Sequence, residues 1–117
     1  MKRLIAIMVG TGFLALAAPA SAQDKAQQGG AFFTSQKCVL CHSVDGKGNK
    51  KGPLDDVGAK LKAEDIRAWL TTPDVMREKT HATRTPAMKD PKLGKEQVDA
   101  LVAFLLTKKT PVADAPK

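Results

Sequence analysis

The stretch CVLCHSVDGKGNKKGP, residues 38–53, contains both cysteines of this 117-residue chain and one of its two histidines. The order is Cys38, two further residues, Cys41 and then His42. Such thiols and imidazoles can form a disulfide, exchange electrons as a dithiol, bind a metal ion or help to hold a prosthetic group. Each of these four uses requires particular residues or structural elements elsewhere in the sequence, and their presence or absence decides which use is favoured.

A structural disulfide is a weak use of this pair, because closing so short a loop gains little chain-entropy stabilisation. A redox dithiol has the same C-x-x-C spacing, which lowers the pKa of a thiol. It is expected, however, at the start of a helix that follows a strand within a βαβ pattern. The sequence has no run of alternating apolar residues that predicts such strands.

A zinc site needs four cysteine, histidine or carboxylate ligands in tetrahedral geometry. Cys38, Cys41, His42 and His81 provide the required number of side chains. Cys41 and His42 are neighbours in sequence, however, so their side chains diverge too strongly to share one small ion easily. The sequence also lacks a second C-x-x-C or an H-x₃₋₅-H pattern, which disfavours zinc.

The pattern C-x-x-C-H is also the attachment signal of haem c, and this use involves all three residues. Two thiols add across the two vinyl groups of the porphyrin, and the three-residue step matches the vinyl spacing on a short helical turn. The imidazole of His42 is then carried beneath the ring, within reach of the iron. We therefore predict one haem c per chain, covalently bound through Cys38 and Cys41.

The first 22 residues have the order of a secretory signal peptide. Lys2 and Arg3 precede an almost wholly apolar run, and the small residues PASA follow, with predicted cleavage after Ala22. An uncleaved membrane anchor is the alternative, but a membrane span needs roughly 20 apolar residues and this run is shorter. Export to the periplasm agrees with haem c, which is attached outside the cytoplasm. After cleavage we expect no stable membrane insertion.

Removing 22 of the 117 residues leaves 95, enough for one small domain. We assign residues 23–110 to this domain and residues 111–117, with two prolines, to a flexible C-terminal tail. A chain of this size buries only about two-thirds of its unfolded surface. It has no tyrosine and, after position 22, four aromatic side chains. A bound haem would complete so small a core.

The chain beyond position 22 is basic, with 17 lysines and arginines against 12 acidic residues, a formal charge of +5. The lysines are scattered rather than clustered, which argues against a nucleic-acid-binding arm. A basic surface on an exported protein favours an acidic protein partner or an anionic membrane face.

Apolar periodicity predicts an all-α domain of three or four short helices. Residues 29–36 suit a short helix after a frayed polar stretch, and residues 63–70 place apolar side chains at i, i+3 and i+4. Thr72-Pro73 resembles the start of one or two further turns. Residues 80–94 have two prolines and no period, so we predict a loop. The strongest helix signal covers residues 95–107.

Beyond these patterns, the sequence resembles a monohaem class I cytochrome c of the bacterial periplasmic type, from Gly29 to Thr107. GGAFFTSQKCVLCH (residues 29–42) is similar to the family's first helix and attachment motif. KGPLDDVG (51–58) resembles the Gly-Pro-Leu turn, and TPAMKDPKLGKEQVDALVAFLL (85–106) resembles the methionine loop and last helix. The sequence departs from the family in having no aromatic residue in this loop and no serine or threonine cap at Lys62 or Gly94.

The resemblance implies a role for five residues. Cys38 and Cys41 would form the thioethers, and His42 would be the proximal iron ligand. The backbone carbonyl of Pro53 would accept a hydrogen bond from the other ring nitrogen of His42. Met88 would place its sulfur on the distal side of the iron. The resemblance further implies that the first and last helices cross closely at Gly29.

The distal ligand decides the expected function. Histidine and methionine together fill both axial positions and raise the reduction potential, which predicts a one-electron carrier and not an enzyme. Met76 and His81 remain alternatives to Met88. With an open or bis-histidine distal site, the protein would instead be a haem enzyme or sensor for peroxide or a gas. A subunit docked permanently on a larger complex is a third possibility.

The expected partners of a carrier are acidic redox proteins: a dehydrogenase, a reductase or an oxidase. We expect a monomer that meets them briefly. The lysines next to the attachment motif and the methionine loop would steer these encounters; they are Lys37, Lys47, Lys50, Lys51, Lys89 and Lys92.

Overall fold

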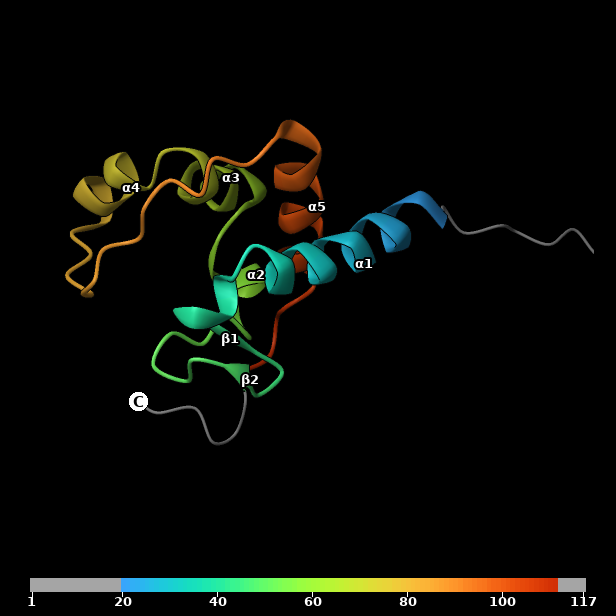
Figure 1. Ribbon diagram of the computed structural model, residues 1–117, viewed down its shortest axis with the longest axis horizontal. Helices are drawn as coiled ribbons and strands as arrows, with labels where there is room; N and C mark the ends of the chain where they lie inside the picture. Colours follow the sequence, from blue (N-terminus) through green and yellow to red (C-terminus); the bar gives the residue numbers. More distant parts are fainter. Residues whose placement is uncertain (1–19, 112–117) are drawn as a thin grey trace, which may run out of the picture.

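A computed structural model describes residues 20–111, which form a mostly helical domain (Figure 1). The predicted signal peptide, residues 1–22, lies outside the described residues except for its last three positions, and so does the predicted tail beyond residue 111. The elements are α1 (Ala20–Ser35), η1 (Cys38–Leu40), β1 (Ser43–Val44), β2 (Lys47–Gly48), α2 (Val57–Lys60), α3 (Ala63–Thr71), α4 (Pro73–Thr80) and α5 (Lys95–Leu106).

The first and last helices make the most extensive contact in the domain (Figure 1). Gly29 of α1 lies directly against α5, where an added Cβ would overlap the carbonyl of Ala100 and the Cβ of Phe104. One turn further, the rings of Phe33 and Phe104 pack with their centroids 5.8 Å apart. The predicted close crossing at Gly29 is therefore confirmed.

The core lies between α5 and the helices that pack on it. Leu101 is completely buried and is surrounded by further apolar side chains of α1, α3 and α5. The cluster comprises Phe33, Val44, Ile66, Leu70, Val98, Leu101, Val102 and Leu105. Ile66 and Leu70 are on the apolar face predicted for residues 63–70, and the predicted helix at 95–107 agrees with α5 to within one residue.

Helix α1 is longer than predicted, because residues 23–28 are helical and not frayed. Alanine, glutamine and lysine, which dominate this stretch, have favourable helix propensities. Ala26, Gly29 and Phe33 recur at helical spacing and are at least half-buried. The polarity of residues 23–28 had concealed this stripe.

The structure contains five α-helices among residues 20–111, where the sequence predicted three or four. The additional helix is α2, a single turn held to the end of α5 by a 2.7 Å hydrogen bond from the Gly58 amide to the Lys108 carbonyl. So short a helix has too few residues to show a period. None of the helices in this part of the chain is both long and apolar enough to cross a membrane.

A two-residue β-ribbon, which was not predicted, follows the attachment motif. Ser43 faces Gly48 and Val44 faces Lys47 in antiparallel register. Asp45 and Gly46 connect the strands, both with positive φ. Asp-Gly with two positive φ angles is the favoured two-residue hairpin turn, so this dipeptide was the signal for the ribbon.

Two segments without long helices remain, and each contains predicted iron ligands. We call residues 38–54 the attachment segment and residues 81–94 the methionine loop. The methionine loop begins at His81, whose left-handed backbone ends α4, and it contains a cis peptide bond between Thr85 and Pro86. In Figure 1 it runs from the end of α4 past α3 to the start of α5.

Candidate functional site

The cysteines of the attachment segment lie on one tight turn that directly follows α1. Lys37, with a φ of 60°, lies between the end of α1 at Ser35 and the 3₁₀ helix η1, which starts at Cys38. The carbonyl of Cys38 accepts hydrogen bonds from the amides of Cys41 at 3.2 Å and of His42 at 2.9 Å. Both thiols are free. The predicted short helical turn is therefore present, with the two thiols on it and the histidine at its end.

The ring of His42 is fixed by a hydrogen bond. Its Nδ1 lies 3.1 Å from the carbonyl oxygen of Gly52. Because a carbonyl can only accept, Nδ1 must carry the proton, and the lone pair is on Nε2. Burial lowers the pKa of His42, the charge of Arg84 adds to this effect, and the bond to Gly52 opposes it. Burial and Arg84 thus both favour the neutral imidazole, the form that binds a metal.

This bond corrects the predicted hydrogen-bond acceptor by one position, from Pro53 to Gly52. Ser43 and Pro53 form a parallel bridge, in which a residue bonds to the two neighbours of the residue it faces. The Ser43 amide accordingly donates to the Gly52 carbonyl at 3.1 Å, and the Leu54 amide donates to the Ser43 carbonyl at 2.9 Å. The Gly52 carbonyl is thus on the side of His42, and Pro53 occupies the position whose missing N–H is not needed.

Asn49 organises the attachment segment, a role that the sequence analysis missed. Its amide lies 2.9 Å from the Val39 carbonyl and 3.0 Å from the His42 carbonyl. Its side-chain Nδ2 donates to the Leu40 carbonyl at 3.1 Å, and its Oδ1 accepts from the Lys51 amide at 3.0 Å. The only sequence signal was an asparagine beside glycines, which is typical of turns.

Met88 is half-buried in the methionine loop and packs against the hydrophobic core cluster. Its two competitors are placed differently. Met76 is 4 % exposed and belongs to the interior side of α4, as expected of a packing residue. His81 is exposed at the end of α4.

Arg84, also missed as a site residue, connects the two segments. Its guanidinium donates a hydrogen bond to the carbonyl of Cys41, 43 positions earlier in the chain. It also lies over Gly52, because a Cβ added there would overlap both the guanidinium and the Cys41 carbonyl. No local sequence pattern predicts this contact, because it depends on how the methionine loop folds back onto the attachment segment.

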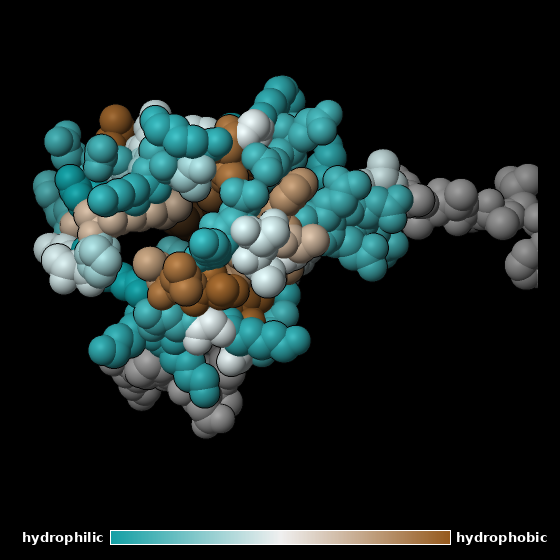
Figure 2. All heavy atoms as spheres, in the orientation of Figure 1, coloured by the Kyte–Doolittle hydropathy of each residue, from teal (hydrophilic) through white to brown (hydrophobic). Residues whose placement is uncertain are grey.

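The surface is hollowed between the methionine loop and the attachment segment, and apolar residues are visible in and beside the hollow (Figure 2). Half-buried apolar side chains from both segments pack on the core cluster, among them Val39, Leu54, Met88 and Leu93. Leu40, between the two cysteines, is 67 % exposed. Two free thiols, a neutral imidazole with an available Nε2 and this apolar surface together fit a haem.

Comparison with known families agrees with this chemistry. The family model described as cytochrome c matches residues 26–109, most of the chain. The chain belongs to the cytochrome c family. A search of curated proteins and a search of solved structures found no match.

As a cytochrome c, the protein carries covalently bound haem c through Cys38 and Cys41 and transfers electrons. The thiols suit this use better than a redox dithiol. Burial raises the pKa of the Cys38 thiol; a backbone hydrogen bond opposes this rise, and Cys41 adds a smaller one. A reactive dithiol needs a lowered thiol pKa instead. Within residues 20–111, no three histidine, cysteine or acidic side chains gather as a metal site, so the zinc alternative finds no ligand set there.

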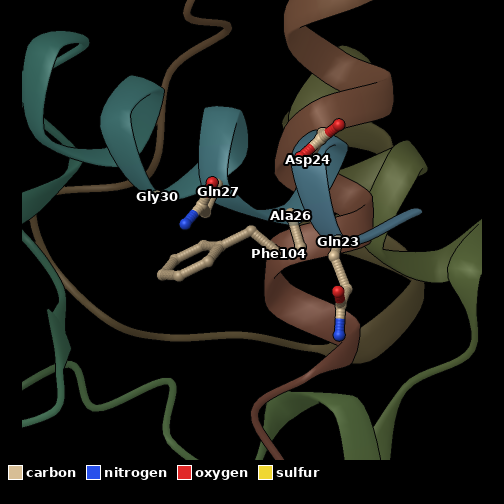
Figure 3. Close-up of a pocket in the computed structure, with 6 residues that line it drawn as sticks. All are labelled: Gln23, Asp24, Ala26, Gln27, Gly30 and Phe104. Atoms are coloured by element: carbon tan, nitrogen blue, oxygen red, sulfur yellow. The ribbon is translucent and has the colours of Figure 1, made fainter. Parts of the chain in front are cut away.

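A shallow pocket elsewhere on this cytochrome c is unrelated to the haem residues. It lies where the start of α1 meets α5, and Phe104 extends from α5 toward Gly30 and Gln27 (Figure 3). Its lining is Gln23, Asp24, Ala26, Gln27, Gly30 and Phe104. None of these side chains is a thiol, a thioether or an imidazole.

Proposed function

We propose that the protein is a periplasmic one-electron carrier in which His42 and Met88 hold the haem iron from opposite sides. The observation that carries this proposal is the His42–Gly52 hydrogen bond, which leaves Nε2 as the nitrogen available to a metal. Bound haem would supply the iron couple that accepts and releases one electron. The chain's own residues would attach it, orient it and enclose it.

Met88 is the best-supported distal ligand among the three candidates. A thioether is a soft, neutral donor that favours reduced iron relative to a second imidazole. Met88 belongs to a loop beside the attachment segment and packs on the core beneath it. Met76 is buried on the inward-facing side of α4, and His81 is exposed. With His42 and Met88 both holding the iron, no position would remain for a substrate, which favours electron carriage over catalysis.

The test of the ligands is an absorption spectrum of the haem-loaded, oxidised protein. We expect the weak charge-transfer band of an iron–methionine bond, lost in Met88→Leu and retained in Met76→Leu. Leucine preserves most of the volume of methionine, so the two variants form a matched pair. Loss of the band in Met76→Leu alone would transfer the role to Met76. A high-spin spectrum that shifts with carbon monoxide would instead support an enzyme or sensor.

The periplasmic location rests on the leader sequence of residues 1–22. Cell fractionation and the intact mass of the exported protein test it together. We expect haem-containing protein in the periplasmic fraction, with Gln23 as its first residue. Protein retained in the membrane fraction with residues 1–22 still present would instead support the uncleaved anchor.

Docking of acidic redox partners is supported by exposed lysines on both ligand-bearing segments. Lys37, Lys47, Lys50, Lys51, Lys89 and Lys92 are all exposed, although Lys92 is paired with Asp90 at 3.1 Å. Opposite charges speed encounter in a salt-sensitive way. Reversing Lys50 and Lys51 to glutamate should slow electron transfer to an acidic partner at low salt, while Lys60→Glu on α2 serves as the control. An unchanged rate would remove these lysines from the docking surface.

A further inference from the structure

Arg84 bridges the two segments that contain the predicted iron ligands. It precedes Met88 by four positions, whereas its hydrogen-bond acceptor, the carbonyl of Cys41, directly precedes His42. The guanidinium also covers the backbone at Gly52, the residue that orients the His42 ring. A single side chain of the methionine loop therefore contacts both backbone positions that define the proximal side of the site.

The methionine loop has few other fixed connections. Across the described chain, no backbone-to-backbone hydrogen bond involves residues 83–93. The last such bond before this stretch joins the Ala82 amide to the Arg77 carbonyl at 3.1 Å, and the next joins Val98 to Gly94 at 3.0 Å. Apolar packing and side-chain bonds must therefore determine where the loop lies.

We propose that Arg84 is a positioning residue that fastens the methionine loop to the attachment segment and thereby keeps Met88 in place. The part that concerns Met88 rests on the proposed function. A hydrogen bond from a charged guanidinium is stronger than one between neutral groups. Its planar fork donates to the Cys41 carbonyl while also lying close to Gly52, an arrangement that the point charge of lysine does not reproduce.

The charge of Arg84 has a second, separable effect. The guanidinium of Arg84 is bonded to the carbonyl of the residue before His42, so its positive charge lies on the proximal side and would disfavour additional positive charge there. It therefore favours the reduced over the oxidised state. Because Arg84 is exposed and screened by solvent, we expect about a threefold change in the one-electron equilibrium constant when the charge is removed. At 59 mV per tenfold, this is about 30 mV.

The experiment compares haem-loaded wild-type protein with Arg84→Ala, Arg84→Lys and the control Arg77→Ala. Arg77 is an arginine of α4 that pairs with exposed Asp74 at 3.6 Å. Amide hydrogen exchange reports on the loop, the charge-transfer band in increasing urea reports on the iron–methionine bond, and potentiometry reports on the charge. Circular dichroism gives the global unfolding midpoint for each variant.

For Arg84→Ala we expect exchange of the hydrogen-bonded amides on either side of Arg84, those of Ala82 and Lys92, to accelerate roughly tenfold, with α5 unchanged. The band should disappear at a lower urea concentration than in wild type, ahead of global unfolding, and the potential should fall. Arg84→Lys should restore the potential but leave exchange fast, because it keeps the charge and loses the fork. Arg77→Ala should alter none of the three readouts.

Unchanged loop exchange in Arg84→Ala would overturn the proposal, as would equal acceleration in the loop and α5, which indicates only global destabilisation. Faster loop exchange with an unchanged band midpoint would overturn the part that concerns Met88. If wild-type protein itself lacks the band, the proposed methionine ligation fails instead. Loop exchange then still decides whether Arg84 fastens the two segments.

Discussion

The attachment segment and the methionine loop both contain predicted iron ligands, but they are held by different forces. In the attachment segment, backbone hydrogen bonds link the η1 turn, the ribbon and the bridge at Gly52 to Leu54, and Asn49 adds four contacts. Residues 83–93 of the methionine loop have no backbone-to-backbone bond in the described structure. That loop depends on Met88 and Leu93 packing on the core and on Arg84.

The polypeptide alone therefore holds the two predicted ligand positions with different rigidity, and the position of His42 is the more rigid one. The proximal histidine is oriented by a carbonyl that is itself fixed in a bridge. Segments with few buried contacts and few backbone hydrogen bonds open at lower free-energy cost than the rest of a protein. We therefore expect the distal side to be the side that opens.

The largest expected effect is in amide hydrogen exchange of the unmodified sequence. The amides of His42, Ser43 and Leu54 donate to backbone carbonyls at 2.9–3.1 Å. We expect them to exchange about a hundredfold or more slowly than the amides of residues 83–93. Nuclear magnetic resonance of the haem-loaded, reduced protein measures both sets in one sample. Comparable protection in the two segments would remove the contrast.

The second prediction places one methyl group in each segment. Gly52→Ala should destabilise the protein by about 2 kcal/mol in urea unfolding, because its Cβ would overlap the Cys41 carbonyl and the Arg84 guanidinium. Gly94→Ala at the end of the methionine loop is the control. Its φ is −71°, and its Cβ would come no closer than 3.8 Å to a heavy atom, Oε1 of Gln97. We expect a change within about 0.5 kcal/mol there, and equal effects at both sites would contradict the packing around Gly52.

The smallest effect concerns acid. The pKa of Asp90 lies below its usual value of 3.8, first because the Lys92 amide donates to its carboxylate and then because the Lys92 side chain does so. A lowered folded pKa means that the charged form stabilises the loop above the usual pKa and that this stabilisation is lost as pH falls through the folded value. Asp90→Asn, which cannot ionise, should therefore speed loop exchange slightly at pH 7, leave it unchanged in acid, and so flatten the acid side of the loop-exchange profile.

The matched control is Asp74→Asn on α4, whose carboxylate is exposed and pairs with Arg77 at 3.6 Å. Loop exchange in this variant should follow the wild-type profile. If Asp74→Asn flattens the profile as much as Asp90→Asn does, general surface charge and not the Asp90–Lys92 turn causes the acid sensitivity of the loop.

Sequence patterns predicted the helices whose information is local. α3 and α5 have apolar side chains at helical spacing. Pro73 is the first residue of α4, a position at which proline is favoured. The prolines of residues 80–94 correctly indicated a loop. The early part of α1 was missed because polar residues concealed a stripe of small side chains, and the single turn of α2 depends on the end of α5.

In the candidate site, the roles implied by the spacing of the motif could be predicted. The roles that depend on contacts between residues distant in the sequence could not. C-x-x-C-H places two thiols and an imidazole on one short turn whatever surrounds them, and the structure forms that turn at η1. The acceptor for His42 was predicted one residue too late, because the alternation of carbonyls in the Ser43–Pro53 bridge fixes it. Asn49 gave only a weak turn signal, and Arg84 gave none.

Neighbouring residues and short periods were enough to predict the attachment chemistry of Cys38, Cys41 and His42, the all-α class and the resemblance to the family. Tertiary structure decided which carbonyl orients His42, how Gly29 lets α1 approach α5, and that Arg84 reaches Cys41 across 43 positions. Contacts between distant residues depend on the register in which whole segments pack. That register is a property of the folded core and cannot be predicted from any short stretch of the chain.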